Sequence, residues 1–141
     1  MKLPPSARDL ILSGAHAHVV TLNPDGSPQV TVVWAGVEGD EIVTAHLMET
    51  RKVRNLRRDP RVAITFESQT KSAIGLKEYL VVYGRSTIVP GGAPELLQKL
   101  AHTYLGPGVK FPTMPDPPPG FINHVTIERI SGVGPWTGRV V

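Results

Sequence analysis

The sequence predicts a mostly β domain, a six-stranded antiparallel split β-barrel with short helices inserted between strands. Segments rich in β-branched residues alternate with turns that contain Gly, Pro, Asn or Asp. The first connections are too short for crossover helices, and no strand–helix–strand unit repeats, so a parallel sheet is disfavoured. Five or six antiparallel strands of this kind point to a closed or split barrel. The whole chain, residues 1–141, is expected to form this single domain.

The strands follow from short segments of strand-forming residues bounded by turn signals. The turn Asn23-Pro24-Asp25-Gly26 joins the first two strands into a predicted hairpin, and Val37-Glu38-Gly39-Asp40 forms a second turn. Gly84 is expected to mark a bulge or bend in a long strand. The six predicted strands are residues 16–22, 29–34, 41–47, 61–66, 77–89 and 121–130.

Three helices are predicted from their start and stop signals, over residues 7–13, 51–58 and 94–104. Ser6 is the expected N-cap of the first helix and Thr50 that of the second, which Asp59-Pro60 should end. Residues 106–120, GPGVKFPTMPDPPPG, cannot form regular structure. Such a segment is most simply a surface connection, or else a lid or substrate rim with Phe111 and Met114 as its apolar contacts.

Composition excludes several classes of function. The chain has no cysteine, which rules out disulfides, thiolate catalysis and cysteine-ligated metals. It has no apolar run long enough for a membrane span, so a soluble cytoplasmic protein without a membrane partner is expected. Its 141 residues can bury a core, but they are few for a cavity that holds a large cofactor within one subunit. A site shared between two copies is therefore plausible.

The most informative segment is residues 51–62, RKVRNLRRDPRV, in which arginines and one lysine crowd onto a short helix. Arg57 and Arg58 lie at its C-terminal end, where the helix dipole favours cations. Arg51 and Lys52 lie in its first turn, where free N–H groups already create positive potential. Such an N-terminus is a good phosphate site, with Asn55 expected on the same face, although many charge runs are simply solvated. Val53 and Leu56 are expected to form the buried face.

Three segments carry a resemblance to a known family: residues 17–34 (AHVVTLNPDGSPQVTVVW), 50–63 (TRKVRNLRRDPRVA) and 127–136 (IERISGVGPW). Together with the order of elements, they resemble the pyridoxamine 5'-phosphate oxidase-like family, whose fold is the FMN-binding split barrel. The branch that uses the deazaflavin coenzyme F-420 is the most similar. The segment 50–63 is the most specific of the three.

The resemblance implies a homodimer with a flavin-like cofactor in the groove between subunits. It places the cofactor phosphate against the helix that starts at Arg51, and the ring against the backbone of residues 29–33. The ribityl chain would lie near the third strand. Lys77, Tyr79 and Trp136 would come from the opposite subunit. The implied cofactor-binding residues are Gln29, Thr31, Val33, Thr44, His46, Thr50, Arg51, Lys52, Asn55, Lys77, Tyr79 and Trp136.

One departure from the family favours F-420 over FMN. The flavin-binding oxidases resemble one another in basic residues at the end of the third strand, where this chain offers Thr44, His46 and Thr50. This weakens the case for tightly held FMN and for pyridoxamine-phosphate oxidation. Coenzyme F-420 also carries a phosphodiester and a polyglutamate tail, which Arg54 and Arg58 could meet.

The expected function is that of an F-420-dependent oxidoreductase, which transfers a hydride to a small conjugated or quinone-like acceptor. The cofactor supplies the hard chemistry, in agreement with the lack of a Ser/His/Asp or paired-carboxylate motif. Catalytic residues are therefore unknown, with Tyr79, Lys77 or solvent as possible proton donors. His16 and His18 lack a third ligand at sensible spacing, so no metal is expected.

The sequence leaves three alternatives open. The first is an FMN-dependent oxidase or reductase of the same fold, and the second is a non-catalytic flavin- or haem-binding protein. The third, a nucleic-acid binder, is disfavoured because aromatic residues do not interleave with the arginines as a stacking platform would require.

Overall fold

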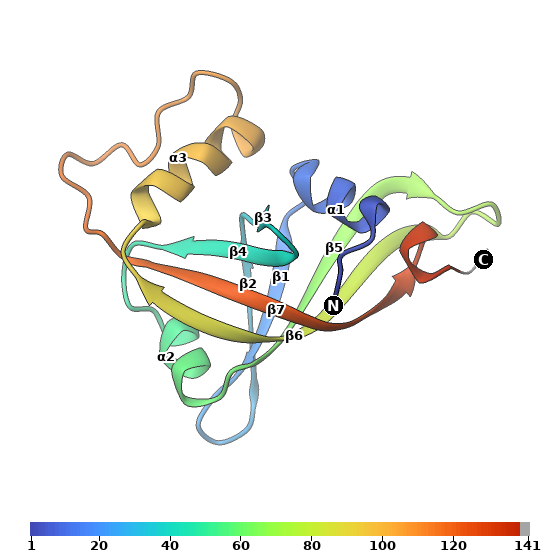
Figure 1. Ribbon diagram of the computed structural model, residues 1–141, viewed down its shortest axis with the longest axis horizontal. Coiled ribbons are helices and arrows are strands. Elements are labelled where there is room, and N and C mark those ends of the chain that lie inside the picture. The colour runs from blue at the N-terminus through green and yellow to red at the C-terminus, as the bar shows by residue number, and fades with distance from the viewer. Residues whose placement is uncertain (139–141) are drawn as a thin grey trace.

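The computed structural model describes residues 1–138 and contains one antiparallel sheet of seven strands with three α-helices (Figure 1). The strand order is β2-β1-β5-β6-β7-β4-β3, so β2 and β3 are the two edges of an open, strongly curved sheet. The elements are α1 (Pro5–Leu12), β1 (Ala17–Leu22), β2 (Pro28–Val33), β3 (Gly36–Glu38), β4 (Glu41–His46), α2 (Arg51–Arg58), β5 (Arg61–Lys71), β6 (Lys77–Pro90), α3 (Ala93–Tyr104), β7 (Phe121–Val133) and the 3-10 turn η1 (Pro135–Thr137).

The predicted class is confirmed, but the sheet has seven strands where six were predicted. The additional strand, β3, lies where a turn was expected and pairs with β4 over three residues. It is too short to show an alternating pattern. β5 also runs to Lys71 rather than ending near residue 66, and with β6 it forms an arm that projects from the molecule (Figure 1). The residues of β5 from Glu67 onward are polar and mostly exposed, which hides their strand character in the sequence.

Helix α2 has the predicted bounds, and the Thr50 side chain accepts a hydrogen bond from the Val53 N–H at 3.4 Å. Helix α1 begins earlier than predicted, with Pro4 as its N-cap residue, so the expected cap Ser6 lies inside the helix. This follows from the fixed φ of proline, which suits the first helical position. Helix α3 begins one residue earlier than predicted, at Ala93. No helix within residues 1–138 is long and apolar enough to cross a membrane.

The core lies on the concave face of the sheet. Alternate residues of β1, β5, β6 and β7 point inward, and α1 covers part of this face with Ala7 and Ile11. The largest fully buried side chains include Phe66, Leu80 and Ile127. Gly84 lies at a register shift between β6 and β7, where a Cβ would lie 2.9 Å from Val125 Cγ1. The bulge predicted at this glycine is therefore confirmed.

Candidate functional site

Helix α2 lies between β1 and β6 and buries more of its surface than its sequence predicts. Val53 and Leu56 are buried as expected, but so are Lys52, which is 6% exposed, and Asn55, which is 1% exposed. Arg51 is exposed. The three residues predicted to share one face thus divide into a buried pair, Lys52 and Asn55, and an exposed Arg51, because strands on two sides of the helix enclose all of its surface except the arginine side.

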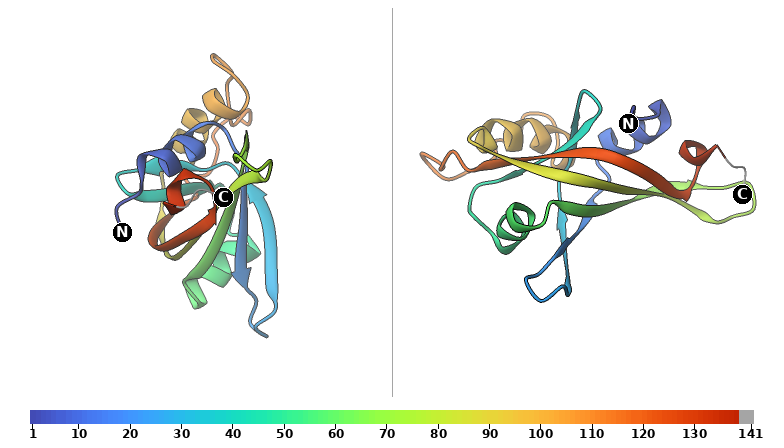
Figure 2. Two further views of the ribbon diagram at one scale, coloured as in Figure 1. Left: turned by 90° about the vertical axis from the view of Figure 1, so that its right-hand side faces the viewer. Right: turned by 60° about the horizontal axis from the view of Figure 1, so that its bottom comes forward.

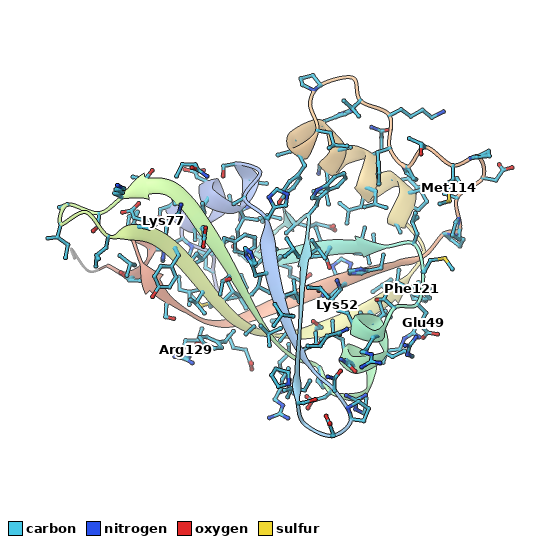
Figure 3. The ribbon with its side chains drawn as sticks, turned by 180° about the vertical axis from the view of Figure 1, so that it is seen from behind. Glu49, Lys52, Lys77, Met114, Phe121 and Arg129 are labelled. Atoms are coloured by element: carbon cyan, nitrogen blue, oxygen red, sulfur yellow. The ribbon has the colours of Figure 1, made fainter. Side chains whose placement is uncertain are left out.

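Lys52 is a buried cation with a neutral partner. Its Nζ donates a hydrogen bond to Thr31 Oγ1 at 2.9 Å, reaching from α2 to the edge strand β2 (Figure 3). Burial lowers the pKa of Lys52 to about 8. Within residues 1–138, no carboxylate lies within ion-pair distance of this ammonium. A buried charge without a counter-ion is costly, so an anion that reached Lys52 would be bound strongly.

Asn55 fixes α2 to the β1–β2 hairpin. Its Nδ2 donates to three oxygens, Thr21 Oγ1 at 3.1 Å, Asn23 Oδ1 at 3.0 Å and Gln29 Oε1 at 3.3 Å. Its Oδ1 accepts from the Arg58 guanidinium at 3.4 Å. The side chain therefore holds α2 against the hairpin that also carries Thr31, the hydrogen-bond partner of Lys52.

His46 and Thr44 extend this polar region onto β4. Both side chains are buried, and His46 Nε2 lies 2.9 Å from Thr44 Oγ1. Burial, and then the charge of Lys52, lower the pKa of His46 to about 4. The imidazole is therefore neutral at pH 7, and it offers a hydrogen-bonding group to the site without adding a second charge.

The depressed pKa of His46 predicts how stability depends on pH. Because the folded pKa of about 4 lies below the unfolded value of 6.5, the unfolded chain binds more protons between these two pH values. The free energy of unfolding should therefore fall as the pH decreases from 6.5 to 4. The slope against pH should correspond to the uptake of up to about one proton on unfolding. Urea unfolding at a series of pH values measures this slope. In His46→Gln it should become shallower, and an unchanged slope would contradict the assignment to His46.

Strand β2 presents two different faces. Gln29, Thr31 and Val33 are half-buried and point toward α2 and the interior, whereas Val30 and Val32 are 61% and 55% exposed on the opposite face. The sequence left open which way Gln29 points. Its hydrogen bonds to Thr21 and Asn55 place it on the inner face with Thr31.

Three arginines of α2 have partners within the chain. Arg57 forms an ion pair with Glu49 and lies over the Phe121 ring, 4.7 Å from its centroid. Arg58 donates to the Leu22 carbonyl, and Arg54 donates to the Glu49 carbonyl at 3.0 Å. These contacts show that much of the basic run serves the local structure.

Three of the predicted site residues lie far from Lys52 within one chain. Lys77 and Tyr79 are on the β5–β6 arm, where Lys77 pairs with Glu67 at 3.9 Å (Figure 3). Trp136 is buried in η1, which packs against α1. One protomer thus brings together Lys52, Asn55 and the predicted residues of β2 and β4, with Thr50 as the cap of α2. It does not bring Lys77, Tyr79 or Trp136 to the same place.

Sequence reasoning missed Thr21 and Tyr104. Thr21 is 1% exposed and accepts from Asn55; its signal was a polar residue at an inward position of an alternating strand. The Tyr104 hydroxyl donates to the Ala15 carbonyl at 2.7 Å and accepts from the Ala35 N–H at 3.1 Å. The Tyr104 ring also stacks on Trp34, and nothing local in the sequence indicates that contact.

Comparisons with known proteins agree with this fold. The family model described as pyridoxamine 5'-phosphate oxidase matches residues 3–134. Among solved structures, an F-420 reductase has 28% identity and a TM-score of 0.73, covering 91% of this chain and 98% of that chain. A conserved hypothetical protein from Mycobacterium tuberculosis has 24% identity and a TM-score of 0.68, covering 90% and 81%.

A third similar structure is that of an FMN-binding protein from Syntrophomonas wolfei subsp. wolfei. It has 17% identity and a TM-score of 0.65, covering 91% of this chain and 84% of that chain. At this identity the likeness shows the fold alone. None of the curated proteins matches the chain.

Proposed function

Because the chain belongs to the pyridoxamine 5'-phosphate oxidase family, we propose that it is an oxidoreductase that binds coenzyme F-420 with the cofactor phosphate at Lys52. The observation that carries the proposal is that this lysine is buried with no carboxylate of residues 1–138 within ion-pair distance. A phosphate would supply the missing negative charge and would also accept hydrogen bonds from the Thr31 hydroxyl and the first turn of α2. Arg51, exposed beside it, is the second cation of the proposed phosphate site.

Two observations favour F-420 over FMN. The F-420 reductase is 28% identical to this chain, whereas the FMN-binding protein is 17% identical. The end of β4 offers Thr44 and a neutral His46 rather than cations, so β4 adds no positive charge to that of Lys52 and Arg51. An FMN monophosphate carries nearly two negative charges and would demand more positive charge than the single charge of a phosphodiester does.

The chain's own residues bind and orient, and the bound cofactor supplies the hydride. In this proposal the backbone of residues 29–33 lies against the ring, and Thr44 and His46 lie beside the ribityl chain. The acceptor is a small conjugated or quinone-like molecule, reduced by a hydride and a proton. The proton comes from solvent or from Lys77 or Tyr79 of a second copy.

The outer face of β1, β2, β5 and β6 supports a homodimer. Register places Val30, Val20, Ala63 and Tyr83 side by side in a row across the four strands. Val30 is 61% exposed and Tyr83 is 37% exposed. In the left view of Figure 2, β1 and β2 form the right-hand side of the molecule, with α1 on the left. An apolar sheet face of this kind is typical of an interface, and we propose that a second copy covers it.

A charge on this face should separate the subunits. Val30→Glu places a carboxylate in the proposed interface of each copy, and desolvating it should raise the dimer dissociation constant by about a hundredfold or more. Sedimentation velocity over a range of concentrations measures this. Leu105→Glu, at an exposed apolar residue after α3, is the matched control. A wild-type monomer, or equal effects of the two substitutions, would contradict the proposed interface.

A direct titration tests the choice of cofactor. The purified protein is titrated with F-420 and separately with FMN, and binding is followed by the fluorescence of each cofactor. We expect F-420 to bind more tightly, and turnover of reduced F-420 with a quinone to follow. Tighter binding of FMN than of F-420 would contradict the proposal and favour the FMN-dependent alternative. Binding of F-420 without turnover over a panel of acceptors would favour a carrier.

A further inference from the structure

Three aromatic rings from distant parts of the chain meet at the end of β2. Trp34, just after β2, stacks on Tyr104 of α3 with centroids 5.4 Å apart and planes 11° apart. Phe111, in the proline-rich segment, contacts the same indole at 5.0 Å with its plane tilted by 58°. The Tyr104 hydroxyl, bonded to Ala15 and Ala35, fixes the first ring pair. Trp34 and Phe111 thus form a rigid corner rather than a flat stack.

The position of Phe111 is fixed by a side chain of α3. Gln98 donates from Nε2 to the Val109 carbonyl at 2.8 Å and accepts the Phe111 N–H at its Oε1 at 3.0 Å. Both ends of one amide therefore hold the segment that carries the ring. Of the two apolar residues expected to line a rim, Phe111 is half-buried in this corner, whereas Met114 is 48% exposed.

A hollow of about 240 Å³ opens at this corner. Its lining includes Val33, Trp34, Ala45, Leu97 and Phe111, with His16 as a polar group, and residues 1–138 contribute no carboxylate, ammonium or guanidinium to it. Its volume lies below the range of about 300–1,000 Å³ typical of pockets for drug-sized ligands. The lining and the size fit one or two fused rings without charge, and aromatic walls at an angle favour a planar ring.

The hollow continues the proposed cofactor site along a single strand. Val33 is two residues beyond Thr31 on the inner row of β2, and residues spaced in this way lie about 7 Å apart. Thr31 holds Lys52, and Val33 lines the hollow. A ring bound at the hollow would therefore lie beside a cofactor ring that rests on residues 29–33.

We propose that this hollow binds the acceptor, an uncharged planar quinone or conjugated ring of one or two rings, and that Trp34 and Phe111 determine its specificity. The identification of the bound ring as the acceptor rests on the proposed function. The ring-binding site itself does not depend on that function. Gln98 is a positioning residue, because it acts through Phe111. The segment 106–120 is then a fixed rim of the site rather than a connection alone.

Equilibrium dialysis with 1,4-naphthoquinone tests the site, and the chain has no cysteine for the quinone to alkylate. Wild type, Phe111→Ala, Gln98→Ala and Met114→Ala are compared with and without F-420. We expect the quinone dissociation constant to rise about tenfold in Phe111→Ala and several-fold in Gln98→Ala, with Met114→Ala unchanged. The affinity for F-420 should be equal in all four, and in steady-state assays Phe111→Ala should raise KM more than it lowers kcat.

The outcomes separate the two proposals. Failure of wild type to bind the quinone, or equal binding by Phe111→Ala and Met114→Ala, would overturn the assignment of the hollow even if F-420 binds normally. If F-420 does not bind but Phe111→Ala still loses the quinone, the proposed cofactor is wrong and the hollow stands. Thermal melting of each variant verifies that the fold is retained.

Discussion

Lys52→Met is expected to weaken the binding of F-420 by about ten- to a hundredfold while making the free protein more stable. The loss of affinity follows from the removal of a charge-assisted hydrogen bond to the phosphate, which is worth about 1.5–3 kcal/mol. The gain in stability follows because methionine has a similar length and removes a buried cation that has no counter-ion among the described residues. We expect the free energy of unfolding to rise by about 1 kcal/mol.

Fluorescence titration and urea unfolding measure the two effects on the same samples. Lys71→Met is the matched control, because Lys71 is exposed on the arm and its replacement removes the same formal charge. If Lys52→Met destabilises the protein and leaves F-420 affinity unchanged, Lys52 is a structural residue and the anion site lies elsewhere. A substitution that raises the free energy of unfolding but lowers F-420 affinity identifies a residue that serves ligand binding at a cost in stability.

Asn55→Leu should lower the free energy of unfolding by about 2–3 kcal/mol. Leucine fills a similar volume but leaves the buried hydroxyl of Thr21 and the amide oxygen of Gln29 without their shared donor. The substitution also releases α2 from the β1–β2 hairpin, so F-420 affinity should fall as well. This variant thus lowers both quantities, in contrast to Lys52→Met.

Urea unfolding measures the loss, with Gln69→Leu as the control at an exposed position of β5. The Thr21→Val, Asn55→Leu double variant adds a second test. The double variant should lose less stability than the sum of the two single variants, because no buried hydroxyl that has lost its donor remains at position 21. Strict additivity would show that the hydrogen bond between Asn55 and Thr21 contributes little.

The sequence predicted what local signals encode. Helix α2 was placed correctly because Thr50 and Asp59-Pro60 are start and stop signals that act within a few residues. The bulge at Gly84 and the class of the sheet were likewise predicted. β3 was missed because a three-residue strand has no period to detect, and its pairing with β4 is what makes it a strand.

The parts of the site that could not be predicted depend on contacts between distant elements. Lys52 is buried because β2 and the neighbouring strands enclose it, and a charge run alone cannot show which of its members is enclosed. The corner of Trp34 and Phe111 joins residues that are far apart in the sequence and depends on the amide of Gln98. Local patterns locate elements, whereas packing decides which side chains meet.

The pKa of Lys52 in the free and F-420-bound protein tests the central claim most directly. It can be measured by ¹³C NMR of the lysine Cε resonances, with Lys52→Met assigning the signal. In the free protein, burial should give a pKa of about 8. A phosphate in contact with the ammonium stabilises its charged form, so the pKa should rise on binding toward the ordinary lysine value of 10.5, and F-420 affinity should fall as the pH rises above about 8. An unchanged pKa in the saturated complex would contradict the account.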